Sequence, residues 1–230
     1  GNITDNGVNG VFTTTARISA GTGDIGNAGN RLDIDVTTLG VGSATTSGAT
    51  NAFFQETGPL VVDDVNVTGT LDLLVGGALT DSATGVVRAG NAVLNVGAAN
   101  DIGSLGNRLD TQVGTLRVAA GSARNVFVNE LDSLVIDDLR LSAGNAANLI
   151  VGGSLSDTGT SLITGTNLVV LVGQDVGSGA NPLDTQIDAL FATTTAGSMT
   201  FHELDAIDLA QVSAGGGGLA TVIADGTIQA

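Results

Sequence analysis

The stretch GDIGNAGNRLDIDVTTLGV (residues 23–41) decides the fold, because it returns twice along the chain. It reappears as NDIGSLGNRLDTQVGTLRV (100–118) and as QDVGSGANPLDTQIDALFA (174–192). Asp24, Asp101 and Asp175 mark the same phase of this repeat, at spacings of 77 and 74 residues. Self-similarity at a fixed period is the sequence signature of repeat architectures, in which each repeat packs on its neighbours.

Two further blocks follow the same period of about 75 residues. NAFFQETGPLVVDD (51–64) returns as NVFVNELDSLVIDD (125–138) and SMTFHELDAIDLAQ (198–211), so Glu56, Glu130 and Glu203 share one phase. LLVGGALTDS (73–82) matches LIVGGSLSDT (149–158). The sequence therefore predicts a single solenoid domain over residues 1–230, built from three internal repeats at approximately 1–76, 77–152 and 153–230.

The composition indicates an all-β chain. The 230 residues include 35 Gly and 23 acidic residues, of which only three are Glu, and all seven basic residues are Arg. Glu and Lys are common on exposed helix faces, whereas Asp, Asn, Gly and Ser favour turns and Val, Ile and Thr favour strands. This bias argues against helices.

Shorter units lie within each period, and each is a β-rich run that ends in small residues. Examples are QVGTLRVAAG (112–121), LVIDDLRLSAG (134–144) and LITGTNLVVLVG (162–173). A unit of roughly 25 residues without a helix fits one coil of a right-handed parallel β-helix (β-solenoid), with about three coils per repeat and about nine in the chain. Bulky residues that alternate with polar ones are expected to face the core: Val113, Leu116 and Val118, then Val135, Leu139 and Leu141.

Two other architectures compete with this interpretation. Leucine-rich repeats have units of similar length, but their fixed Leu/Asn pattern and helical segments are not visible here. An array of β-sandwiches stays open, because a period of about 75 residues can also be one small antiparallel domain. The short strands and the intermediate units favour the solenoid.

The motif D-[IV]-G-x-x-x-N-x-L-D-x-x-[VI]-x-x-L, followed by the N-x-x-x-x-E block and Gly/Ala/Thr-rich strands, resembles the repeats of very large bacterial surface proteins. These are the filamentous-haemagglutinin-like adhesins and related giant β-strand-repeat proteins. The resemblance covers nearly the whole chain and implies an exported β-helical shaft used in adhesion, biofilm matrix or filament building. The third copy departs from the pattern, since Pro182 stands where Arg31 and Arg108 stand in the others.

The charge balance limits the partners. A formal net charge of −16 repels nucleic acid and anionic membranes, because phosphate binding needs clustered Lys or Arg. No apolar run approaches the length of a membrane span, so we expect no membrane insertion. Cys is absent, which removes disulfides and thiolate chemistry. Together with the resemblance, these features lead us to expect an extracellular or cell-surface location.

Catalysis is the main functional alternative, since many β-helices are polysaccharide lyases or hydrolases. Such sites need carboxylates a few ångströms apart, often beside Arg, Lys, His or Ca²⁺. If three coils separate equivalent residues, Glu56, Glu130 and Glu203 lie roughly 14 Å apart and cannot pair. We expect them at turn or surface positions that satisfy backbone N–H groups, and we predict that the chain is not an enzyme, with no catalytic and no cofactor-binding residues.

His202 and the aspartate pairs are the remaining candidate ligands. His202, the single histidine, precedes Glu203, and neighbours on a strand point to opposite faces, so joint chemistry is not expected. Ca²⁺ is the one cofactor with some support, because Asp oxygens are hard ligands. Asp63/Asp64 and Asp137/Asp138 are also expected to diverge to opposite faces, which favours a solvated surface, and the metal-site residues stay unknown.

The first and last coils are expected to have exposed edges. GNITDNGVNG and ATVIADGTIQA read as ordinary coil sequence without a capping segment. An uncapped edge templates further strands, which predicts head-to-tail self-association or continuation in a longer solenoid. The function expected from the sequence is an extracellular structural or adhesive shaft or filament segment, with a surface or glycan receptor as a partner. The alternative is a carbohydrate-active lyase or hydrolase, or a glycan-binding β-helix.

Overall fold

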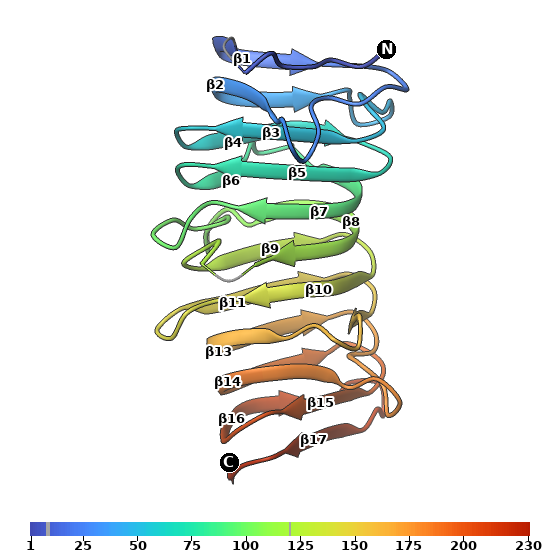
Figure 1. Ribbon diagram of the computed structural model, residues 1–230. Helices are drawn as coiled ribbons and strands as arrows, with labels where there is room; N and C mark the ends of the chain where they lie inside the picture. Colours follow the sequence, from blue (N-terminus) through green and yellow to red (C-terminus); the bar gives the residue numbers. More distant parts are fainter. Residues whose placement is uncertain (8–9, 120) are drawn as a thin grey trace.

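The computed structural model describes residues 1–7, 10–119 and 121–230 as a tall stack of strands (Figure 1). These residues contain strands and turns and no helix. The strands are β1 (Val11–Ile18), β2 (Leu32–Val41), β3 (Ala52–Glu56), β4 (Leu60–Asn66), β5 (Thr70–Val75), β6 (Leu79–Asp81), β7 (Val87–Asn95), β8 (Leu109–Val118), β9 (Val126–Glu130), β10 (Leu134–Arg140), β11 (Ala146–Val151), β12 (Leu155–Asp157), β13 (Ile163–Val172), β14 (Leu183–Thr194), β15 (Met199–Glu203), β16 (Ile207–Ser213), β17 (Ala220–Ala224) and β18 (Ile228–Gln229).

The strands pair in parallel, as a β-solenoid requires. Each pairing between named strands is parallel, and the strands join into one sheet that winds through about 10 coils. Partners in neighbouring coils lie about 20 residues apart in sequence, as for Leu60 and Leu79. The predicted parallel β-helix is confirmed, and the antiparallel sandwich is wrong, because a parallel pair needs a crossover of a dozen or more residues.

Inward residues stack in two columns on opposite sides of each coil. The first column runs through Ile25, Ala52, Leu71, Ala92, Leu116 and Ile136. The second runs through Leu79, Ile102, Val126, Ala147, Leu168 and Leu190. All of these side chains are buried, so the space between the columns is the hydrophobic core.

Equivalent residues of successive repeats alternate between the two columns. Ile25 of the first copy lies in the first column, and its equivalent Ile102 lies in the second. Val176 of the third copy pairs with Leu155, which returns it to the first column. One repeat therefore spans about three and a half coils, half a coil more than the expected three. Successive repeats are related by a half-turn about the solenoid axis, a relation that the sequence period alone does not reveal.

The alternation of burial along the strands matches most of the expected core. In β8, Val113, Leu116 and Val118 are buried as predicted. In β10, Val135 is half-exposed, which corrects its predicted inward position, and Leu134 and Ile136 are buried instead. A register shift between Ile136 and Asp138 inserts one extra residue and changes the alternation within the strand.

Both ends of the stack carry exposed apolar side chains. The side of β1 away from β2 has no strand partner among the described residues, and Phe12 on β1 is 72% exposed. At the other end, Leu219 is 69% and Ile228 45% exposed. No helix within the described residues is long and apolar enough to cross a membrane.

Candidate functional site

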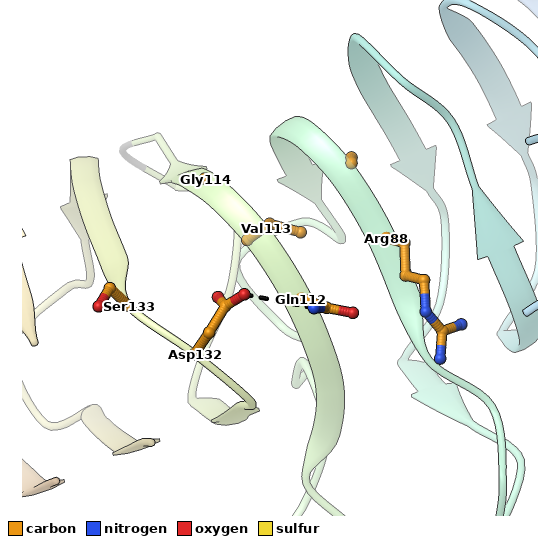
Figure 2. A pocket seen from close by; sticks show the side chains of 7 residues that line it. Arg88, Gln112, Val113, Gly114, Asp132 and Ser133 are labelled. Carbon is orange, nitrogen blue, oxygen red and sulfur yellow. Dashed lines mark hydrogen bonds between the residues drawn. The ribbon is translucent and has the colours of Figure 1, made fainter. Parts of the chain in front are cut away.

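The largest hollow on the surface is an open groove of about 560 Å³ beside the bends of β7 and β8 (Figure 2). It is lined by Arg88, Ala89, Gln112, Val113, Gly114, Asp132 and Ser133. The bend is possible because Gly114 has no side chain: a Cβ there would lie 2.8 Å from the carbonyl oxygen of Gly90. The groove is thus a product of close coil packing at a corner.

The polar groups of this groove already have partners. The Gln112 Nε2 donates to Asp132 Oδ2 at 3.3 Å, and the Arg88 guanidinium is 3.0 Å from an Asp64 carboxylate oxygen. Asp132 is the only carboxylate among the seven lining residues. A glycoside hydrolase of the usual kind needs two carboxyl groups that flank one bond, and these lining residues do not supply them.

The three glutamates of the repeat lie inside the solenoid. Glu56, Glu130 and Glu203 are 2%, 1% and 0% exposed, so the expected surface position is wrong. Their expected role toward backbone N–H groups is right. Val113 N donates to Glu130 Oε2 at 3.0 Å, and Asp132 N donates to the other oxygen at 3.2 Å.

The same contacts recur in the other copies. Glu56 accepts from the backbone N–H groups of Val36 and Gly58, both at 2.8 Å. Glu203 accepts from Ile187 N at 3.2 Å and from Asp205 N at 3.4 Å. Each glutamate therefore bridges a strand of one coil to the turn that follows in the next, and it satisfies donors that the bend takes out of the sheet.

Burial dominates the titration of two of these glutamates. Desolvation raises the pKa of Glu130 and of Glu203 to about 7, although hydrogen bonds from Val113 and Thr111 to Glu130, and from Thr185 and Ile187 to Glu203, act in the opposite direction. A perturbed carboxyl group is a candidate catalytic acid only where a substrate can reach it. Glu130 lies in the second column and Glu203 in the first, so they are buried on opposite sides of the stack.

His202 faces outward between two aspartates. Its Nδ1 is 3.0 Å from Asp184 Oδ1, and its Nε2 is 3.4 Å from Asp225 Oδ1. The hydrogen bond to Asp184, and then that to Asp225, raise the pKa of His202 above its usual value. The side chain of His202 is 31% exposed whereas Glu203 is buried, which confirms that the two neighbours face opposite ways.

Both members of each aspartate pair lie on the outside, which corrects the expected divergence to opposite faces. A bulge causes this, because the β2–β4 register shifts after Leu39 and Asp64 takes a φ of 51°. The pairs form ion pairs with four arginines: Arg17–Asp63, Arg88–Asp64, Arg117–Asp137 and Arg140–Asp138. Across the described part of the chain, no three His, Cys, Asp or Glu side chains gather as a metal site would require.

The repeat motif itself builds a protruding loop. After Ile102 and Gly103, the chain leaves the sheet for a tight turn in which Ser104 and Asn107 exchange backbone hydrogen bonds, and it resumes at Leu109. The Asn107 side chain donates to the carbonyl oxygen of Asp81 at 3.1 Å. Asn30 and Asn181 make the same contact with Asp5 and Asp157.

The phase-marking aspartates form short ladders along the axis. Asp24 N donates to Asn2 Oδ1, and Asp24 Oδ1 accepts from Asn51 N at 3.0 Å. Asp101 accepts in the same way from Asn125 N. Sequence reasoning missed this role, although the recurrence of Asp24, Asp101 and Asp175 at one phase was its visible signal.

Copies one and two brace their loops with arginine. Arg31 donates to Asp72 at 2.7 Å, and Arg108 donates to Asn148 Oδ1 at 3.1 Å, so each guanidinium reaches across neighbouring coils. Pro182 replaces this brace in the third copy. No protein-family model, curated protein or solved structure matches the chain.

Proposed function

We propose that this chain is an extracellular structural or adhesive shaft, a rigid segment that holds length and presents a regular surface. The single observation that carries the proposal is the use made of the repeat residues. The recurring Asp, Asn and Glu side chains bind backbone groups of neighbouring coils, as Glu130 does with Val113 N at 3.0 Å and Asp101 with Asn125 N at 3.0 Å. Residues kept at one phase for this purpose stabilise the stack.

The edges of the stack support the partners in this proposal. Parallel strands with unpaired backbone groups and exposed apolar side chains, such as Phe12 and Ile228, accept further coils. Head-to-tail association with a second copy, or continuation in a longer solenoid, satisfies these groups. The acidic, Cys-free surface suits an exported protein, and a surface or glycan receptor would bind along the shaft.

A glycan-binding or carbohydrate-active β-helix is the second candidate. The groove of about 560 Å³ favours it, because Gln112, Asp132 and Ser133 offer hydrogen-bonding groups to sugar hydroxyls. Binding is the better supported of these two activities, since the lining lacks a second carboxylate for acid and base roles. We therefore propose that the chain is not an enzyme.

The decisive experiment measures attachment and turnover on the same material. Beads coated with the chain are tested for attachment to abiotic, matrix-coated and polysaccharide-coated surfaces, and soluble polysaccharides are assayed for new reducing ends and unsaturated products. We expect attachment without turnover. Turnover that disappears in Asp132→Asn or Gln112→Ala would replace the shaft with the enzyme, and failure to attach to any of the surfaces would refute adhesion.

A further inference from the structure

The outer surface of β9, β11, β13 and β14 is free of charged side chains at its central positions. Outward residues of these strands stack in two rows along the solenoid axis, as the registers fix. We call this surface the uncharged face; its rows are Phe127, Asn148, Val169 and Phe191, and Asn129, Ile150, Leu171 and Thr193.

The half-turn between repeats provides a matched face on the opposite side of the stack. The equivalent row there contains Phe53, Asp72, Val93 and Arg117 on β3, β5, β7 and β8. We call this the charged face. Asp72 is bound by Arg31 at 2.7 Å, and the Arg117 guanidinium lies 4.0 Å from Asp137.

The two faces share a backbone and differ in chemistry. Asp72, Asn95 and Arg117 of the charged face correspond to Asn148, Leu171 and Phe191 of the uncharged face. The tip of the overhanging loop changes in the same direction, from Ala28 to Leu105. Because the scaffold is the same, these replacements are not needed to form the strands.

The replacements leave large apolar groups in water. Leu171 is 44%, Phe191 37% and Leu105 65% exposed. Beside Phe191 lies a hollow of about 340 Å³, lined by Val169, Val170, Leu171, Phe191, Thr193 and Gln211. An exposed apolar patch with a hollow rimmed by uncharged polar groups is the chemistry of an interaction surface.

We propose that the occupant of the uncharged face is a second copy of this chain, docked through the same face. Two copies that each carry a net charge of −16 repel one another wherever carboxylates meet. The uncharged face lets them approach without burying a carboxylate. Arg108, which reaches this face at Asn148, carries the sign opposite to the net charge and adds no repulsion.

The geometry suits an isologous pair. A two-fold axis normal to the face would place Leu171 and Phe191 of each copy opposite the hollow of the other. Strand spacing and rise give the face roughly 400 Å² per partner. A standard interface buries about 800 Å² per partner, so the pair is weak and reversible, and it joins shafts side by side. This lateral contact is separate from the end-to-end stacking proposed above.

The test is sedimentation equilibrium of the intact chain from micromolar to millimolar concentration, at low and high salt. We expect a monomer–dimer equilibrium that strengthens with salt, because salt screens the repulsion between the copies. Phe191→Arg, which installs the residue of the charged face, should weaken dimerisation at least tenfold. Val93→Arg, which makes the same type of change on the charged face, should leave it unaltered, and circular dichroism checks that both variants fold.

Three results would overturn the proposal. They are a wild-type chain that stays monomeric at millimolar concentration in high salt, a dimer that survives Phe191→Arg, and binding of an uncharged polysaccharide at this face by a chain that never dimerises. An open-ended series of oligomers that is insensitive to Phe191→Arg would reject the lateral contact and leave the shaft function standing.

Discussion

Asp81 differs from its equivalents in one contact, although all three aspartates are buried. Asp5 and Asp157 accept a hydrogen bond from the backbone of a glycine two residues on, Gly7 and Gly159, with φ of 74° and 76°. Ala83 holds that place in the second copy, and a left-handed φ is unfavourable for a residue with a Cβ. Asp81 Oδ1 is consequently buried without a hydrogen-bond partner.

Asparagine substitutions should therefore have unequal effects at these sites. Asp157→Asn places an amide against donors from Gly159 and Asn181, and we expect a loss of about 1–3 kcal/mol in the free energy of unfolding. Asp81→Asn keeps an acceptor for Asp110 N and removes a carboxylate whose pKa is raised by burial, so the change should be close to zero. Urea unfolding measures both, and equal losses would refute this account of Asp81.

Stability should fall as pH rises from about 5 to 8. The pKa of Glu130 and Glu203 lies near 7 in the folded chain and near 4.5 when unfolded, so the folded state binds more protons in this interval. His202 acts in the same direction, because a raised pKa stabilises the fold below 6.5 and the gain is lost as pH passes the folded value. Denaturant titrations across this range provide the measurement.

Glu130→Gln is the variant that tests the origin of this slope. Glutamine fills the same space and does not titrate, so stability should depend less steeply on pH than in the wild-type chain. A slope that is unchanged in Glu130→Gln, or stability that rises between pH 5 and 8, would contradict the assignment to the buried glutamates.

The loop elements depend on the glycine of the repeat motif. Gly26, Gly103 and Gly177 have φ between 54° and 65°, and each lies against a backbone carbonyl of the next coil. A Cβ on Gly103 would lie 2.3 Å from the carbonyl oxygen of Phe127. Backbone strain and steric overlap therefore both oppose a side chain at this position.

Gly103→Ala should destabilise the fold by at least about 1–3 kcal/mol. Gly106→Ala, in the same loop, is the matched control, since a Cβ there meets no atom within 4 Å and its φ is not left-handed. Thermal unfolding of both variants gives the comparison. Similar melting temperatures for the two variants would show that the Gly103 contact does not constrain the loop.

The sequence predicts the elements well and their positions around the axis less well. Alternation in residues such as Val113, Leu116 and Val118 predicts core-facing strands because the side-chain period of a strand is two. It fails at Val135, where a bulge breaks the period. The burial of Glu130 was also missed, because a carboxylate in the core depends on donors such as Val113 N that only the folded coil brings within reach.

At the scale of the molecule, the number of coils per repeat sets which residues can act together. A period of about 75 residues does not state how many coils it covers, since coil length varies, for example from 19 residues between Leu60 and Leu79 to 24 between Ile102 and Val126. The extra half coil separates equivalent residues onto opposite sides. It also creates the paired charged and uncharged faces, so catalytic convergence of repeat residues and one-sided display are both excluded by geometry.

The half-coil arrangement is the central claim, and spin-label distances test it most directly. The chain has no Cys, so labelled cysteines replace pairs among Ala28, Leu105 and Ala180, which occupy exposed tips of the three equivalent loops. With seven coils between the outer loops on one side, the 28–180 distance should be about 34 Å. The 28–105 and 105–180 distances should each be at least about 25 Å, because two sheets and the loops outside them lie between these labels. Adjacent distances near about 14 Å, with an outer distance near about 29 Å, would place all three loops on one side and contradict the account.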